Sequence, residues 1–155
     1  TIEEGGPAAE DVGAGELPWT PVMRAQGGQA ALGEFAQWAV VGAPAGLGTD
    51  TLAAGLGAVL DTHDMLRARV APGGRTLTVA GPGEPAAADL ITRVDATRGR
   101  ADRPGRTGPP YQTDALDRIA DHAAREAVGR LDPAAGVLVQ AVWVDAGPDR
   151  TGRLV

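Results

Sequence analysis

The sequence predicts one domain of the α/β class, in which a mixed sheet is layered with helices. Two helical apolar patterns, over residues 49–63 and 114–131, alternate with short apolar runs bounded by glycine and proline. Such alternation favours a sheet covered by helices, although it does not fix the strand topology. The length of 155 residues suits a single folding unit.

Charge and composition exclude several classes of function. The net charge of −6 argues against nucleic acid or an anionic membrane as the main partner. The absence of cysteine excludes disulfides, thiolate catalysis and cysteine-based metal sites. No apolar run approaches the length of a membrane span, and the acidic N-terminus does not resemble a signal peptide. We therefore expect a soluble, cytoplasmic protein.

The N-terminal third is expected to contain a lead-in, a short helix and a strand. Residues 1–16 have few apolar side chains and predict a linker or disordered lead-in before a domain spanning 17–155. The stretch "LPWTPVM" is expected to dock against a core and to begin a short helix near Pro21. The run "EFAQWAVVGAPAG" predicts a largely buried strand.

A helix, a hairpin and a further strand are expected next. Thr49 or Asp50 is a suitable N-cap for a helix whose apolar stripe continues to His63, so His63 is expected to face the core. The runs "LRARV" and "RTLTVA" around "APGG" predict a hairpin, and "DLITRVDA" predicts another short strand. The arginine-rich stretch 97–110 has no period and predicts a mobile, solvated loop.

The C-terminal part predicts a helix and two strands. The second helix is expected after Thr113 as its N-cap and stops near Leu131, before Asp132-Pro133. The run "GVLVQAVWVDAG" predicts a long strand in the centre of a sheet, and "RLV" begins another strand. Because a long strand needs a partner of similar length, we expect that the chain is cut within this last strand.

The residues alone offer no complete catalytic set. There is no phosphate-binding loop and no zinc-protease motif, and the sequence lacks serine altogether. His63 and His122 fall in different predicted helices, which disfavours a metal site built on two histidines. We therefore assign no catalytic residue and no metal ligand from the sequence.

Five stretches together resemble condensation-superfamily domains of non-ribosomal peptide synthetases. "LDTHDMLRARV" is similar to the family's H-H-D-x-L-R-x-R segment, with Thr62 in place of the first histidine. "LPWTPVM" resembles the opening L-x-x-T-P-[IV]-[QM] motif, "FAQWAVV" the F-x-Q-S-V-L-L strand, and "APAGLGTDTLAAGLGAVL" the helix that follows. "LDPAAGVLVQAVWVDAGPDRTGRLV" resembles the strand pair that leads into the catalytic H-H-x-x-x-D-[GA] motif. The resemblance covers residues 15–155.

The resemblance implies a chloramphenicol-acetyltransferase-like half-domain, the N-terminal subdomain of such a domain. It gives His63, Asp64 and Arg67 structural roles, with an Asp64–Arg67 ion pair at the end of a helix. The family's catalytic histidine belongs to the H-H-x-x-x-D-[GA] motif, which would begin beyond Val155. Residues 1–155 alone are therefore predicted to be inactive.

Gln37 and Trp38 are the candidates for the substrate channel. The family strand carries a glutamine near the reaction centre at the position of Gln37, and a polar residue in an apolar strand needs a partner or a purpose. The alternative is that Gln37 is hydrogen-bonded at the rim of a sheet. If its side chain points away from the expected catalytic motif, the assignment fails.

Within the superfamily, "TPVM" and "GVLVQAVWVDAG" resemble the epimerization branch. The intact domain would take a peptidyl group from a carrier protein's phosphopantetheine arm and exchange its α-proton by acid–base chemistry, with no directly bound cofactor. Its implied partners are the remainder of the domain and the peptidyl carrier protein. Amide-bond condensation is the alternative within the family. A non-catalytic binding or docking module, complete at 155 residues, is the alternative from another class.

Overall fold

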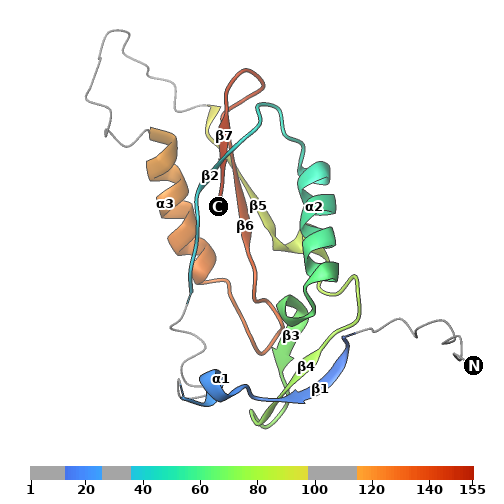
Figure 1. The fold of residues 1–155 in the computed structure, drawn as a ribbon. Coiled ribbons are helices and arrows are strands. Elements are labelled where there is room, and N and C mark those ends of the chain that lie inside the picture. Colours follow the sequence, from blue (N-terminus) through green and yellow to red (C-terminus); the bar gives the residue numbers. More distant parts are fainter. Residues whose placement is uncertain (1–12, 26–35, 98–114) are drawn as a thin grey trace, which may run out of the picture.

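The structure is a computed structural model that describes residues 13–25, 36–97 and 115–155. In these ranges the chain has a mixed α/β fold with three α-helices and two β-sheets (Figure 1). This agrees with the predicted α/β class. No helix of the described ranges has the length and apolar character needed to cross a membrane.

The larger sheet has four strands and is mixed. Its order is β2 (Val41–Ala43), β7 (Gly152–Leu154), β6 (Ala141–Asp145) and β5 (Ile91–Asp95). β5 and β6 are parallel, whereas β7 is antiparallel to both β6 and β2. All five residues of β6 are buried, which confirms the prediction of a central strand.

Two long helices flank this sheet on opposite sides, α2 (Thr49–Thr62) and α3 (Ala115–Val128) (Figure 1). The buried stripe of α3 is mostly alanine, and small side chains let a helix approach a sheet closely. This stripe packs on the alternate side chains of β6 that face α3. The resulting core cluster consists of Leu116, Ala120, Ala123, Ala127, Val142, Val144 and Ala146.

The smaller sheet lies at one end of the molecule beside α1 (Pro21–Ala25) (Figure 1). Its order is β1 (Gly15–Pro18), β4 (Thr76–Val79) and β3 (Ala68–Val70), with all pairs antiparallel. The predicted hairpin of β3 and β4 is confirmed. Trp19 is buried against Val70 and Leu77, and its Nε1–H donates to the Gly74 carbonyl at 3.0 Å, so "LPWTPVM" docks as expected.

Two short 3₁₀ helices complete the described elements, η2 (Asp64–Arg67) and η3 (Ala87–Leu90). η2 connects the end of α2 to β3, and η3 leads directly into β5. The predicted strand "DLITRVDA" is confirmed as β5.

The strand predicted from "EFAQWAVVGAPAG" is shorter and more exposed than expected. β2 has only three residues and Ala43 alone among them is buried, because β2 is an edge strand paired only with the short β7. Residues 36–40 pair with no described strand. Residues 34 and 35 of the predicted run lie outside the described residues.

Several predicted boundaries also differ. α2 begins at Thr49 with Gly48 as its N-cap and no side-chain cap, so the predicted cap is wrong by one or two residues. α3 ends at Val128, because Gly129 already begins a turn. Residues 15 and 16 of the predicted lead-in belong to β1. Residues 1–12, residues 98–110 of the arginine-rich stretch and the Thr113 cap lie outside the described residues.

Candidate functional site

The guanidinium group of Arg67 is buried at the junction of α2, η2 and β4. Its side chain is 1% exposed. Nε donates to the Ala80 carbonyl at 3.0 Å, and Nη1 donates to the Leu60 carbonyl and to the Asp61 carbonyl, the latter at 3.2 Å. Nη2 donates to Oδ1 of Asp64 at 2.6 Å. The predicted Asp64–Arg67 ion pair is therefore present.

These bonds give Arg67 a structural role at the helix end. Backbone carbonyls in the last turn of a helix lack intrahelical partners, and a cation there is favoured by the helix dipole. Arg67 supplies both donors and charge, and its bond to Ala80 ties the end of α2 to the segment that follows β4. Each nitrogen of the guanidinium is engaged, so it is not available to a substrate.

The prediction that His63 faces the core is wrong, because His63 is exposed. It is the C-cap of α2, with φ −117° and ψ 82°, and its backbone N–H donates to the Val59 carbonyl. An apolar stripe continues only while the backbone keeps helical angles, and it ends here at Leu60, which is 2% exposed. The structure thus brings Asp64 and Arg67 together but leaves His63 outside their contact.

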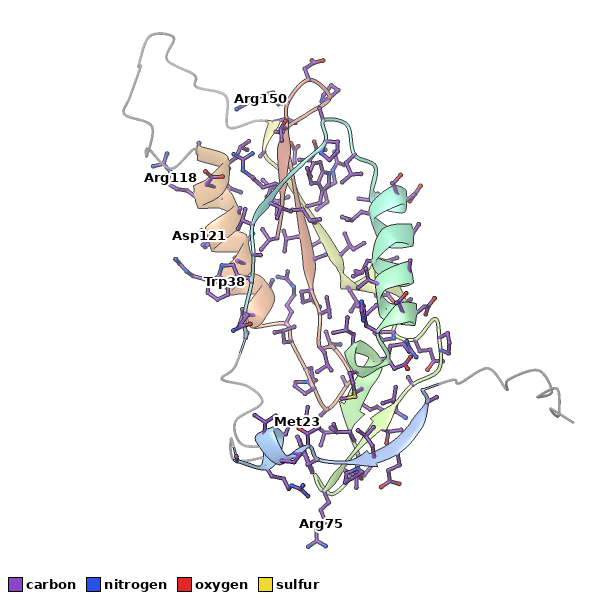
Figure 2. All side chains as sticks on the ribbon, in the orientation of Figure 1. Met23, Trp38, Arg75, Arg118, Asp121 and Arg150 are labelled. Carbon is purple, nitrogen blue, oxygen red and sulfur yellow. The ribbon has the colours of Figure 1, made fainter. Side chains whose placement is uncertain are left out.

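The structure places both predicted channel residues on one cavity of about 340 Å³. Trp38 lies beside α3 in Figure 2 and is 49% exposed. The cavity is bounded by segment 37–39, by segment 138–140, by α3 and by Val155. Its lining residues are Gln37, Trp38, Ala39, Ala124, Ala127, Val128, Leu131, Leu138, Val139, Gln140 and Val155. A substrate role for Gln37 and Trp38 stays a prediction.

The cavity can bind apolar groups but brings no acid or base of its own. None of its lining side chains titrates near neutral pH. The polar side-chain groups of its lining residues are the amides of Gln37 and Gln140 and the indole N–H of Trp38, and Oε1 of Gln140 accepts from Nε of Arg130 at 3.2 Å. Segment 138–140 and α3 were not predicted to line this cavity. Only the packing of the folded sheet brings them opposite residues 37–39.

A second cavity, of about 390 Å³, lies between the start of α2 and the end of β6. Asp145 on its wall is 9% exposed. Oδ1 of Asp145 accepts from the Gly147 N–H at 2.8 Å, and Oδ2 accepts from Nε and Nη2 of Arg93 at 3.0 and 2.5 Å. The hydrogen bond from Gly147, followed by that from Arg93, lowers the pKa of Asp145 below its ordinary value.

Asp145 is therefore a charged, paired carboxylate and not a proton donor at neutral pH. Arg93 lies within β5, and Asp145 is the last residue of β6. The parallel register of β5 and β6 sets Arg93 opposite Trp143 and Asp95 opposite Asp145, so Arg93 reaches Asp145 diagonally across the two strands, and no local sequence pattern predicts this contact.

The described histidines do not form a metal centre. His122 is exposed on α3, with Nε2 at 3.4 Å from Oε1 of Glu126. Across the described ranges no group of three or more metal-ligating side chains occurs.

Comparison of the chain with known protein families, with curated proteins and with solved structures finds no match.

Proposed function

We propose that the chain is the N-terminal part of a non-ribosomal peptide synthetase epimerization-type domain, which acts on a peptidyl thioester held by a carrier protein. The proposal includes the chloramphenicol-acetyltransferase-like fold and a cytoplasmic location. It is supported by the five resembling stretches. In the implied order they fall on the β1–α1 segment, the residues that lead into β2, α2, the η2–β3 junction and the β6–β7 pair.

The observation that carries the proposal is the bonding of Arg67. In the family segment that "LDTHDMLRARV" resembles, the arginine is structural and the segment turns a helix into a strand. Here α2 ends, η2 follows and β3 begins within this stretch, and the buried Arg67 bonds to Asp64 and to the helix-end carbonyls. The position of the arginine and its role both agree with the resemblance.

The cavity at Gln37 and Trp38 is the proposed apolar side of the substrate channel. Exchange of an α-proton needs a base on one face of the carbon and an acid that returns the proton. The lining side chains of the cavity supply neither. The proposal assigns proton transfer to the H-H-x-x-x-D motif in the remainder of the domain. The phosphopantetheine arm of the carrier protein holds the substrate, and no cofactor is bound directly.

Amide-bond formation is the second reaction that the resemblance allows. It would use the same carrier-bound thioester but would require a second, aminoacyl carrier protein as acceptor. A non-catalytic docking module remains the rival of another class. The apolar, acid-free lining of the cavity is the observation that favours it.

One assay separates the three alternatives. A longer protein that contains the remainder of the domain is incubated in D₂O with a peptidyl thioester on its carrier protein, and the peptide is analysed by mass spectrometry. Epimerization predicts deuterium at the α-carbon of the last residue. Condensation predicts a longer peptide when an aminoacyl carrier is added. A docking module predicts neither product.

The substrate-channel assignment is tested in the same longer protein with Gln37→Ala. We expect a lower rate of α-proton exchange with unchanged stability, because the side chain is exposed and touches the proposed channel. Glu16→Ala, an exposed position on β1, is the matched control. If both variants exchange the α-proton at the same rate, Gln37 does not contribute to the substrate channel.

A further inference from the structure

A further cavity, of about 140 Å³, lies between the smaller sheet and the segment that leads into β6. Trp19, Val70 and Leu77 from the core of the smaller sheet form its buried side. Met23 of α1, seen beside the smaller sheet in Figure 2, and Met65 of η2 also border it. Met65 is 40% exposed and forms part of the rim. We call this cavity the methionine pocket.

Hydrogen bonds hold the walls of the methionine pocket in place. The Val70 N–H donates to the Pro133 carbonyl at 2.9 Å, which ties β3 to the opposite wall. Asp132 and Val137 exchange two backbone hydrogen bonds, at 2.8 and 2.9 Å, and close the loop of that wall. The Nε1–H of Trp19 donates to a carbonyl of the β3–β4 turn at 3.0 Å. The pocket is therefore formed before a ligand arrives, which lowers the entropic cost of binding.

The lining of the methionine pocket favours an uncharged, apolar ligand. Every lining side chain except that of the exposed Arg69 is apolar, and the indole N–H of Trp19 is already bound. A polar group deep in the pocket would lose its hydrogen bonds to water without replacement. The positive charge of Arg69 also disfavours a cation.

The size and the chemistry of the pocket point to one aromatic ring. An apolar cavity of about 150 Å³ in another protein takes up benzene, and the methionine pocket has nearly this volume. Methionine sulfur makes favourable contacts with the edge of an aromatic ring, and two aromatic rings attract each other edge to face. Met23, Met65 and Trp19 supply both kinds of contact.

The methionine pocket adjoins the cavity at Trp38, because Leu138 lines both. We propose that the methionine pocket binds one aromatic ring, and that in the intact domain this ring is a side chain of the carrier-bound peptidyl substrate. The assignment to a substrate rests on the proposed function, which assigns the neighbouring cavity to the substrate channel. It adds a substrate class, peptides with an aromatic residue, and a subsite for that residue.

The two methionines of the sequence give a direct readout, because both border the pocket. The full chain, with ¹³C-labelled methionine methyl groups, is titrated with phenol and followed by NMR. The hydroxyl group of phenol can stay in water at the rim. Cyclohexanol, with the same ring size but no π electrons, is the control ligand.

We expect phenol to shift the methyl signals of Met23 and Met65 and the indole N–H signal of Trp19 along one saturable curve. The signal of Trp143, which is buried in β6, should not move. Cyclohexanol should bind about fivefold more weakly or less, because it lacks the contacts between sulfur and ring.

Three variants locate the binding site. Ala68 is a buried lining residue, and the added carbons of Ala68→Ile fill the pocket, so phenol should bind about tenfold more weakly or less. Met65→Lys, which adds a charge at the rim and removes one sulfur, tests the same site without a change in the core. It should weaken binding about threefold or more, read at Met23. Val59→Lys, at an exposed apolar position of α2 outside the pocket, is the matched control.

Each of three results would overturn the aromatic site: methyl signals that do not respond to phenol, equal affinity for phenol and cyclohexanol, or equal affinity for phenol in Met65→Lys and Val59→Lys. Methyl signals that depend on protein concentration without phenol would overturn it too, since a second copy of the chain would then occupy the pocket.

The substrate assignment is tested in the longer protein with dipeptidyl thioesters on the carrier protein. Phenylalanine at the last or the preceding position is compared with alanine at both. We expect one phenylalanine substrate to have a kcat/KM about tenfold higher or more, and Ala68→Ile to lower this value to that of the alanine substrate. Equal kcat/KM for all substrates would overturn the substrate assignment.

The two proposals fail separately. If phenol binds in the methionine pocket but the longer protein neither exchanges an α-proton nor forms an amide bond, the proposed function fails and the aromatic site stands. If the longer protein is active but phenol leaves the methyl signals unchanged, the inference about the methionine pocket alone fails.

Discussion

The buried guanidinium of Arg67 is expected to contribute strongly to stability. Arg67→Ala leaves the carbonyls of Leu60, Asp61 and Ala80 without this donor and removes the partner of Asp64. We expect a loss of about 3 to 4 kcal/mol in the free energy of unfolding. Denaturant unfolding measures it, with Arg69→Ala, an exposed position on β3, as the control. A loss equal to that of the control would contradict the structural role.

His63 provides the complementary test at the same helix end. Because its side chain is exposed and Arg67 does not bond to it, His63→Ala should change the free energy of unfolding by no more than about 0.5 kcal/mol. The same denaturant titration applies. A loss as large as that of Arg67→Ala would indicate that the His63 side chain is buried in the core.

Asp145 should make stability depend on acid pH. Its pKa in the folded protein lies below the ordinary value of 3.8, so the unfolded chain binds the proton more readily. The stabilisation is complete above that value and is lost as the pH falls through the lower, folded pKa. Asp145→Asn removes this charge. Between about pH 5 and pH 2, the free energy of unfolding of the variant should therefore depend less on pH than that of the wild type. Denaturant unfolding at several pH values measures both, and an equal dependence on pH in the two proteins would contradict the prediction.

Among single residues, the sequence predicted those with local partners and missed those with distant ones. Asp64 and Arg67 are three residues apart, so the resemblance and the helix end predicted their contact. The pairing of Arg93 with Asp145 depends on sheet order, which no local pattern encodes. His63 was misplaced because the helical period was extended one residue beyond the helix.

At the scale of elements, the close contact of β7 with β6 depends on Gly152. A Cβ at this position would overlap the ring of Trp143 and lie 2.5 Å from the Val144 carbonyl oxygen. The Val144 backbone cannot move aside as a flexible side chain can. Gly152→Ala should therefore lower the free energy of unfolding by about 2 kcal/mol or more. Gly55→Ala, in the open on α2, should instead stabilise by about 0.5 to 1 kcal/mol. Thermal unfolding compares the two variants, and equal shifts in Tm would contradict the packing.

The elements that the sequence predicted best have strong internal periods. α2, α3 and the β3–β4 hairpin were found because their apolar spacing or turn residues are local. The extent of β2 and β6 was overestimated, since a strand ends where its neighbour ends and not where apolar residues end. Residues 36–40 and 138–140 are apolar in large part yet pair with no described strand.

At the scale of the whole molecule, the two sheets and the flanking helices form a scaffold whose described residues hold no complete set of catalytic groups. Asp145 is held in an ion pair, His63 and His122 are exposed and apart in sequence, and the cavity at Trp38 is lined without an acid or base. We propose that residues 1–155 support a reaction whose proton transfer is performed by groups outside them.

The most direct test incubates residues 1–155 alone with the carrier-bound peptidyl thioester in D₂O and measures deuterium at the α-carbon by mass spectrometry. The longer protein that contains the remainder of the domain is measured in parallel. We predict that residues 1–155 leave the exchange rate at that of the protein-free reaction, while the longer protein raises it. Exchange catalysed by residues 1–155 alone would contradict the claim.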